Sequence, residues 1–259
     1  MRDVKELDAL WQSYQLRVTD EIVRSPEVLF CNGSAIGTLG NFSASTGKAK
    51  SKKTFNVSAI LAAALTNGDV LRYIAEFPDD KRTILYFDPE QSPHHCQRVM
   101  KRALRLAGLP VDRHPENLIF AQLRAITPDL RLELIDNAIA NTPNVGLVII
   151  DGVRDLMFDI NNAIESSRLI GKLMEWTDKY QMHIHTVLHL NKSDDNVRGH
   201  VGTELNNKAE TVLQVCKSTM NSEVTEVSAS CIRSMDFPPF AFIVNEAGLP
   251  EIAADYTFA

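Results

Sequence analysis

A cluster of lysines around a single glycine offers the clearest chemistry in this sequence. Residues 43–55 hold one glycine and four lysines, and they lie between a run that favours a β-strand and an alanine-rich run that favours a helix. The first backbone N–H groups of a helix face an anion bound at its start, and cations are disfavoured there. Four lysines at that position therefore favour a bound anion, although a solvated lysine run is the alternative. The stretch predicts a phosphate-binding loop.

The match to the P-loop pattern Gly-x-x-x-x-Gly-Lys-Ser/Thr is incomplete. Gly47 fits the first glycine and Lys53-Thr54 fits the closing pair, but Lys52 stands where the second glycine belongs. We expect Lys53 to reach the terminal phosphates of a nucleotide and the Thr54 hydroxyl to bind Mg²⁺. The side chain of Lys52 would hinder tight closure of the loop, because only glycine adds no bulk there. The residues of this stretch expected to contact the nucleotide are Gly47, Lys48, Ala49, Lys50, Ser51, Lys52, Lys53, Thr54 and Phe55.

Two acidic residues follow other predicted strands. Glu90 comes just after the strand expected at 83–88, and Asp151 ends the apolar run 145–151. Ligands of an open parallel sheet bind outside the carboxyl ends of its strands. There Glu90 could polarise a water that attacks a γ-phosphate, and Asp151 could hold Mg²⁺ or its bound water. The alternatives are a solvated turn acid for Glu90 and, for Asp151, the aspartate with which many α/β strands end.

A histidine ends a further predicted strand at the same edge. His189 could sense the γ-phosphate, although a lone strand histidine is more often a satisfied core residue. The polar loop 192–202 that follows could face DNA, cover a substrate or simply connect two elements.

The other histidines and the cysteines lack the spacing of metal ligands. The pair His183 and His185 has no carboxylate or thiol at a suitable interval, and neither does the adjacent run 94–96. The four cysteines are scattered and are expected to be reduced thiols. We therefore expect no metal other than Mg²⁺.

Composition indicates an ordinary globular protein. The chain has 259 residues, 44% hydrophobic and 23% charged, which is enough for one large domain or two small ones. Its net charge of −6 argues against a generally basic, nucleic-acid-coating surface but leaves room for a local basic groove. The N-terminus has no apolar signal core and no run approaches membrane-spanning length, so we expect a cytoplasmic protein without a membrane partner.

Strand and helix patterns alternate over most of the chain. The expected strands are 36–45, 83–88, 118–123, 145–151 and 184–190, and the expected helices are 54–66, 92–108, 127–141 and 162–180. Such alternation predicts a parallel sheet covered on both faces.

The two ends of the chain differ from this pattern. After a short helix at 203–208, strands expected at 211–215, 224–232 and 240–244 have no intervening helices, which indicates antiparallel additions to one sheet edge. Residues 4–24 have apolar residues at helical spacing. The predicted N-terminal helix either covers the sheet edge or docks on a neighbouring subunit.

The phosphate loop, Glu90, Asp151 and His189 occur in an order that resembles the RecA-like ATPases. The resemblance is closest to the branch with plasmid RepA-type hexameric helicases, DnaB-type helicases and RadA, and it spans about 34–252. It implies an α/β, RecA-like P-loop NTPase fold that binds ATP and Mg²⁺, with a core at 31–259 and an N-terminal helical arm at 1–30. It also implies a general-base role for Glu90, a γ-phosphate sensor at His189 and a DNA-facing loop at 198–202.

The resemblance extends to a residue that would act on a second subunit. Residues 228–233 resemble the late strand of the family, which ends in Lys-x-Arg and reaches the nucleotide of the next subunit. Arg233 matches the arginine, whereas Cys231 stands in place of the lysine. The resemblance implies a homo-oligomer, for which a hexamer is one arrangement. The replacement of the glycine at the position of Lys52 also resembles related proteins from plasmids and mobile elements.

The sequence therefore predicts an ATP-hydrolysing motor that acts on DNA in replication, transposition or mobilization of a plasmid or mobile element. The alternative is a catalytically weak or inactive nucleotide-binding regulator or scaffold, which Lys52 and Cys231 favour. A small-molecule kinase is disfavoured by the antiparallel C-terminal strands and by the lack of an arginine-rich lid.

Overall fold

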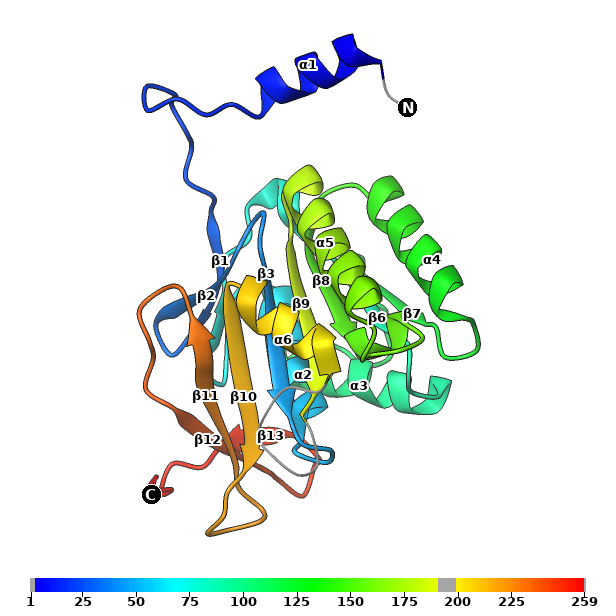
Figure 1. The fold of residues 1–259 in the computed structure, drawn as a ribbon. Coiled ribbons are helices and arrows are strands. Elements are labelled where there is room, and N and C mark those ends of the chain that lie inside the picture. The colour runs from blue at the N-terminus through cyan, green and yellow to red at the C-terminus, as the bar shows by residue number, and fades with distance from the viewer. Residues whose placement is uncertain (1–2, 191–198, 259) are drawn as a thin grey trace.

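A nine-stranded sheet forms the centre of the computed structural model, which describes residues 3–190 and 199–258 (Figure 1). The strands are β3 (Phe42–Gly47), β6 (Thr83–Asp88), β7 (Leu118–Gln122), β8 (Val145–Asp151), β9 (His183–His189), β10 (Thr211–Lys217), β11 (Thr225–Ile232), β12 (Phe240–Val244) and β13 (Pro250–Ile252). Their order is β13-β12-β11-β10-β3-β9-β8-β6-β7. The strands from β10 to β7 pair in parallel, and β11 to β13 extend the β10 edge with antiparallel pairing. The predicted fold class is confirmed.

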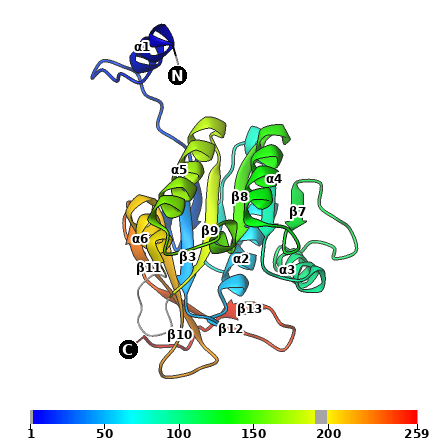
Figure 2. The ribbon, with the colours of Figure 1, turned by 45° about the vertical axis from the view of Figure 1, so that its right-hand side comes forward.

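Helices cover both faces of this sheet. They are α2 (Lys53–Thr66), α3 (Pro93–Leu106), α4 (Pro128–Asn141), α5 (Ala163–Tyr180) and α6 (Gly199–Lys208), with short 3₁₀ helices η1 (Asp79–Lys81) and η2 (Val153–Leu156). Helices α2 and α3 lie on one face, and α4, α5 and α6 on the other (Figures 1 and 2).

Strand β8 shows why the central strands read as continuous apolar runs. Leu147 and Ile149 join the core formed with α2 and α3, whereas Val148 and Ile150 join the core formed with α4 and α5. Successive side chains of a strand point to opposite faces, so a strand buried on both faces needs apolar residues at every position. Asp151, the next residue, is the last residue of β8 and lies at the carboxyl end of this strand.

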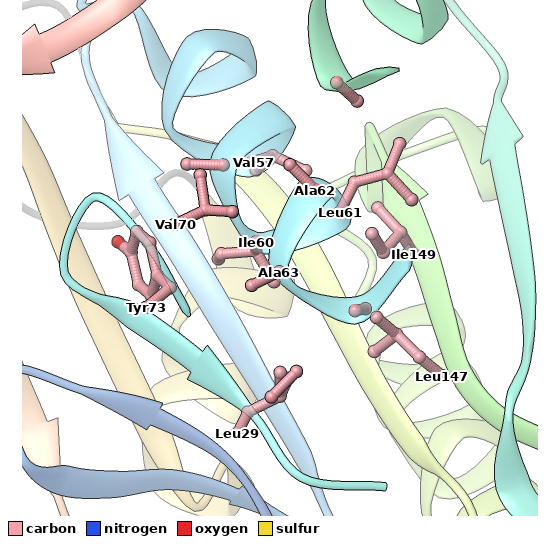
Figure 3. Close-up of a cluster of buried hydrophobic side chains, with 14 of the residues drawn as sticks. Leu29, Val57, Ile60, Leu61, Ala62, Ala63, Val70, Tyr73, Leu147 and Ile149 are labelled. Carbon is pink, nitrogen blue, oxygen red and sulfur yellow. The ribbon is translucent and has the colours of Figure 1, made fainter. Parts of the chain in front are cut away.

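Helix α2 is buried on nearly all sides. Its residues Val57, Ile60 and Leu61 pack between β8 and a second, smaller sheet (Figure 3). That sheet has the order β2-β1-β5-β4 and contains β1 (Glu27–Cys31), β2 (Ser34–Thr38), β4 (Asp69–Val70) and β5 (Tyr73–Ala75). Full burial of each large aliphatic side chain contributes roughly 1.5–3 kcal/mol, so the helix that follows the lysine loop is firmly held.

Two predicted elements are wrong. The strand expected at 36–45 is two strands, β2 and β3, because the chain turns at Leu39–Asn41, where Gly40 has a φ of +84°. The N-terminal helix α1 (Val4–Ser13) ends well before residue 24. None of its residues is buried, and it stands apart from the sheets in both ribbon views (Figures 1 and 2). Of the two alternatives for this helix, covering the sheet edge is therefore wrong, and docking on a neighbouring subunit stays a prediction.

A buried hydrogen-bonded chain joins β3 to β9. The Oγ of Ser43 lies 2.7 Å from His183 Nε2 and 2.8 Å from His185 Nδ1, and His185 Nε2 lies 2.9 Å from Ser45 Oγ. Burial lowers the pKa of His183, and it lowers the pKa of His185 to about 3. Both imidazoles are therefore neutral in the folded protein and hold the two central strands together by hydrogen bonds.

Within residues 3–190 and 199–258, none of the helices combines the length and the apolar character needed to cross a membrane.

Candidate functional site

Most of the residues predicted to form a site meet at the carboxyl ends of the parallel strands. Strands β3, β9, β8 and β6 are neighbours in that order and are parallel, so their carboxyl ends lie together. They end at Gly47, His189, Asp151 and Asp88 respectively. The lysine loop leaves from Gly47, and Glu90 follows Asp88 in the next turn. Four segments that are distant in sequence thus contribute to a single site.

The lysine loop is closed by its own buried lysine. The Nζ of Lys53 donates to the backbone carbonyls of Gly47 at 2.7 Å and Lys48 at 2.8 Å. Burial lowers the pKa of Lys53 to about 8, against the opposing influence of Asp151 and Glu90. The ammonium group therefore lies inside the curve of the loop and faces two carboxylates, where a cation can meet a phosphate.

Gly47 is required by its surroundings. A Cβ at this position would lie 2.2 Å from the carbonyl oxygen of Val215 in β10 and 2.6 Å from Ser51 Oγ. No side chain fits against a fixed backbone oxygen at such a distance. The hydroxyl of Ser51 is buried and, among the described residues, has no hydrogen-bond partner.

Lys52 has the backbone conformation that glycine would adopt most easily. Its φ is +65° in the left-handed region, at the residue that caps the start of α2, and Lys50 has a φ of +64°. This conformation costs an L-residue roughly 1–2 kcal/mol. The Nζ of Lys52 donates to the backbone carbonyl of Glu223 at 2.7 Å. It thus contacts the turn between β10 and β11.

Two buried carboxylates lie side by side next to the loop. Asp151 accepts a hydrogen bond from the Tyr86 hydroxyl at 2.9 Å, and the Thr54 hydroxyl is a further partner. Burial, together with the neighbouring carboxylate of Asp88, raises the pKa of Asp151 to about 6. The negative charges of Asp88 and Asp151 repel each other, and a divalent cation bound between them would relieve this repulsion. Carboxylate and hydroxyl oxygens are suitable ligands for Mg²⁺, so Asp151 and Thr54 fit the predicted metal.

Asp88 holds the turn that carries Glu90. Its Oδ1 accepts the backbone N–H groups of Glu90 at 3.0 Å and Gln91 at 2.7 Å, and its Oδ2 accepts the Gln91 side-chain amide at 2.8 Å. Asp88 is not among the site residues predicted from the sequence. The signal was present, because an aspartate followed by proline in a turn commonly accepts backbone N–H groups two and three residues on.

Glu90 and His189 form a pair at the mouth of the site. Glu90 Oε2 lies 3.8 Å from His189 Nε2, an ion-pair distance longer than a direct hydrogen bond. Interaction with His189 lowers the pKa of Glu90, and Lys53 and Arg154 lower it further. Glu90 is therefore ionised at neutral pH. The Nδ1 of His189 is buried and lacks a hydrogen-bond partner within the described part of the chain.

A pocket of about 370 Å³ opens beside the loop. It is lined by residues 50–55, by His189, and on the α3 side by Gln91, His95, Val99 and Arg102. The Arg102 guanidinium lies 3.7 Å from the centre of the Phe55 ring, which fixes this wall of the pocket. A larger groove, of about 810 Å³, lies between α4 and α5 and contains none of the predicted site residues.

Two further neighbours of the site were not predicted from the sequence. Arg154 lies in η2, three residues after Asp151, and its charge lowers the pKa of Glu90. Tyr86 lies two residues before Asp88 in β6 and donates to Asp151. Neither belongs to a recognisable motif, so only the three-dimensional arrangement reveals them.

Arg233 lies at the opposite end of the strands, next to the start of β10. Strand β11 runs antiparallel to β10, and Ile232 pairs with Thr211 at the start of β10. The guanidinium of Arg233 donates to the carbonyl of Lys208 at 3.3 Å. Arg233 is therefore separated from the lysine loop of its own chain. Of the predicted polar loop 192–202, residues 192–198 lie outside the described residues. The prediction of a loop is wrong for residues 199–202, which form the first turn of α6.

The Asp151→Asn substitution is expected to stabilise the nucleotide-free protein. Folding raises the pKa of Asp151 from 3.8 to about 6, so the folded state opposes its ionisation. The cost is absent below the lower value and complete above the higher one, and its removal should raise the free energy of unfolding by about 1–3 kcal/mol. Urea unfolding above and below this pH window measures the gain, which should vanish in acid.

Asp136→Asn is the matched control, because hydrogen bonds from Trp176 and Lys172 lower the pKa of Asp136 instead. Its removal should not stabilise the protein at any pH. If the Asp151→Asn protein is no more stable than the wild type above this pH window, then ionisation of Asp151 does not destabilise the nucleotide-free protein, and this interpretation is contradicted.

Comparison with known proteins assigns the chain to a family. No curated protein matches it. The model of the AAA domain, an ATPase-type P-loop domain, matches residues 35–195, which run from β2 through β9 and include the lysine loop, Glu90, Asp151 and His189. Because this match covers more than half of the sequence, the chain belongs to the AAA domain family.

Proposed function

We propose that the chain binds ATP with Mg²⁺ at residues 47–55 and hydrolyses it. The observation that carries this proposal is the convergence of Lys53, Asp151 and the Glu90–His189 pair at the carboxyl ends of adjacent parallel strands. A cation, a metal-binding carboxylate and an ionised base are the groups that phosphoryl transfer to water requires.

Each side chain has a distinct role in the proposed reaction. Lys53 exchanges the carbonyls of Gly47 and Lys48 for phosphate oxygens, and the first backbone N–H groups of α2 would face the same phosphates. Thr54 and Asp151 would hold Mg²⁺, which neutralises charge on the phosphates when it is bound.

Glu90 accepts the proton of the attacking water. Its lowered pKa keeps it ionised at neutral pH, and its turn is fixed by Asp88. The oxygen of the water forms a bond to the γ-phosphorus, the bond from that phosphorus to the bridging oxygen breaks, and the products are ADP and phosphate. His189, beside Glu90, is suited to report whether the γ-phosphate is present.

A nucleotide-binding regulator or scaffold without turnover is the second candidate. It is favoured by Lys52 at the glycine position, whose left-handed backbone and bulk leave the loop less free to adapt. The paired acids at Asp88 and Asp151 and the ionised Glu90 favour the hydrolysing enzyme, because binding alone needs no ionised base beside the phosphates.

We further propose that the chain acts as a homo-oligomer on DNA, in the manner of the RepA and DnaB branch and in the replication or mobilization of a mobile element. Arg233 lies far from its own lysine loop and so suits a role at the nucleotide of a neighbouring copy. The arm, residues 1–30, includes α1 with exposed Leu7 and Trp11, followed by exposed Tyr14, and these side chains can dock on a neighbour. Residues 31–259 would form the ATPase core.

Measured release of phosphate from Mg²⁺-ATP, with and without single-stranded and double-stranded DNA, tests these proposals. Hydrolysis stimulated by DNA supports the motor, and hydrolysis indifferent to DNA supports an ATPase with another partner. Tight ATP binding without phosphate release supports the regulator and contradicts the enzyme. Failure to bind ATP contradicts both.

A further inference from the structure

Lys52 links the lysine loop to the turn between β10 and β11. Its Nζ donates to the carbonyl of Glu223 at 2.7 Å, across 171 residues of sequence. The backbone at Lys52 has a φ of +65°, so the bond is made by a residue in a conformation that lysine rarely adopts. The residue that departs from the P-loop pattern is thus the one with a long-range anchor.

The acceptor of this bond is itself well fixed. Residues 218–224 form the β10–β11 turn, in which the Ser218 N–H donates to the carbonyl of Val224 at 3.0 Å. The Glu223 N–H donates to Asn221 Oδ1 at 3.0 Å. The Ser218 hydroxyl lies 2.6 Å from the Tyr256 hydroxyl and accepts the Met220 N–H at 3.1 Å. A carbonyl held in such a turn can fix the side chain that reaches it.

Strand β10 and its turn therefore hold the lysine loop at both ends. At the first end, Gly47 packs so closely on the Val215 carbonyl that no side chain fits. At the second end, Lys52 is bound to Glu223. The loop between these points carries N–H groups that can bind a phosphate. It also carries the carbonyls of Gly47 and Lys48, which accept from the Lys53 ammonium group and which a phosphate would replace.

We infer that Lys52 is a positioning residue, which fixes the closing turn of the phosphate loop through the Glu223 carbonyl. Glycine at this point of a P-loop adopts the left-handed conformation without strain, whereas lysine needs a compensating interaction. The bond to Glu223 supplies it. The inference rests on the proposed function, because it concerns how the loop is shaped for nucleotide.

Three substitutions of Lys52 separate positioning from direct contact with phosphate. Lys52→Met keeps the side-chain length and the strained backbone but removes the donor. Lys52→Gly also removes the donor but relieves the strain. Lys52→Arg keeps a donor. Loss of a charged hydrogen bond predicts an ATP dissociation constant raised about tenfold or more in Lys52→Met, with Lys52→Gly and Lys52→Arg within about threefold of the wild type.

Lys50→Met serves as the comparison, because Lys50 has the same left-handed conformation and the same charge in the same loop. It measures the effect of losing one charge without changing the bond to Glu223. Equal losses of affinity in Lys52→Met and Lys50→Met would overturn the inference. Equal losses in Lys52→Met and Lys52→Gly would overturn it in favour of direct contact with phosphate.

Amide hydrogen exchange in the nucleotide-free protein provides a test that does not need ATP. Lys52→Met should speed exchange in both residues 48–54 and the β10–β11 turn, whereas Lys52→Gly should speed it only in the turn. Unchanged exchange in Lys52→Met overturns the inference. If the wild-type protein fails to bind ATP, the proposed function fails, and hydrogen exchange still decides whether Lys52 fixes the loop.

Discussion

Replacing Glu90 with glutamine is expected to lower the rate of ATP hydrolysis by about 10²–10⁴-fold, the usual contribution of a general base. Glutamine has the same shape but cannot accept the proton of the attacking water. The turn should stay in place, because Asp88 binds the backbone N–H of residue 90 and not its side chain. The affinity for ATP should therefore stay close to that of the wild type, and single-turnover phosphate release with equilibrium ATP binding measures both.

Glu246→Gln is the matched control for this substitution, since Glu246 is exposed and lies in the turn before β13. A Glu90→Gln protein that hydrolyses ATP at nearly the wild-type rate would exclude Glu90 as the base. A wild-type protein that binds ATP and releases no phosphate would leave the regulator as the better description.

Replacing Lys53 with methionine should have the largest effect on nucleotide affinity. Charge-assisted hydrogen bonds contribute about 1.5–3 kcal/mol each, so loss of two from the ammonium group to phosphate predicts a dissociation constant raised by roughly 10²-fold or more. The carbonyls of Gly47 and Lys48 also lose their donor, so the free loop should be less ordered. Titration with a fluorescent ATP analogue measures the affinity.

The pH dependence of this titration identifies the group responsible. Burial lowers the pKa of Lys53 to about 8, so its positive charge is lost as the pH rises through that value. ATP affinity of the wild type should weaken over the same range, and in Lys53→Met this dependence should be absent. Lys208→Met, at an exposed lysine on the opposite edge of the sheet, should bind ATP like the wild type. Unchanged affinity in Lys53→Met would remove this lysine from the site.

The central strands were predictable because their signal is local. The strands expected at 83–88 and 145–151 have these bounds in the structure, since each is a run of apolar residues that ends in an aspartate. Helix α2 was predicted to within one residue, and Asn67 ends it in the left-handed conformation as its sequence suggests. The meeting of Glu90, Asp151 and His189 at one edge followed from parallel pairing alone.

The remaining features depend on contacts between distant parts of the chain. The small sheet forms because β1 pairs with β5, more than forty residues later, and no local pattern shows this pairing. The sequence showed that Lys52 is out of place but not that its side chain reaches Glu223. Arg154 and Tyr86 could not be found either, because their roles come from proximity to Glu90 and Asp151 and not from spacing.

The isolated position of α1 determines where the molecule is least stable. A helix of ten residues without buried side chains gains no packing energy, and isolated helices of this length are marginal in water. Local unfolding of α1 should therefore require almost no free energy, whereas α2 can open only when its core is lost. A stable α1 therefore requires a surface that covers Leu7 and Trp11, and burial there must contribute enough free energy to offset the entropy lost when the helix becomes fixed.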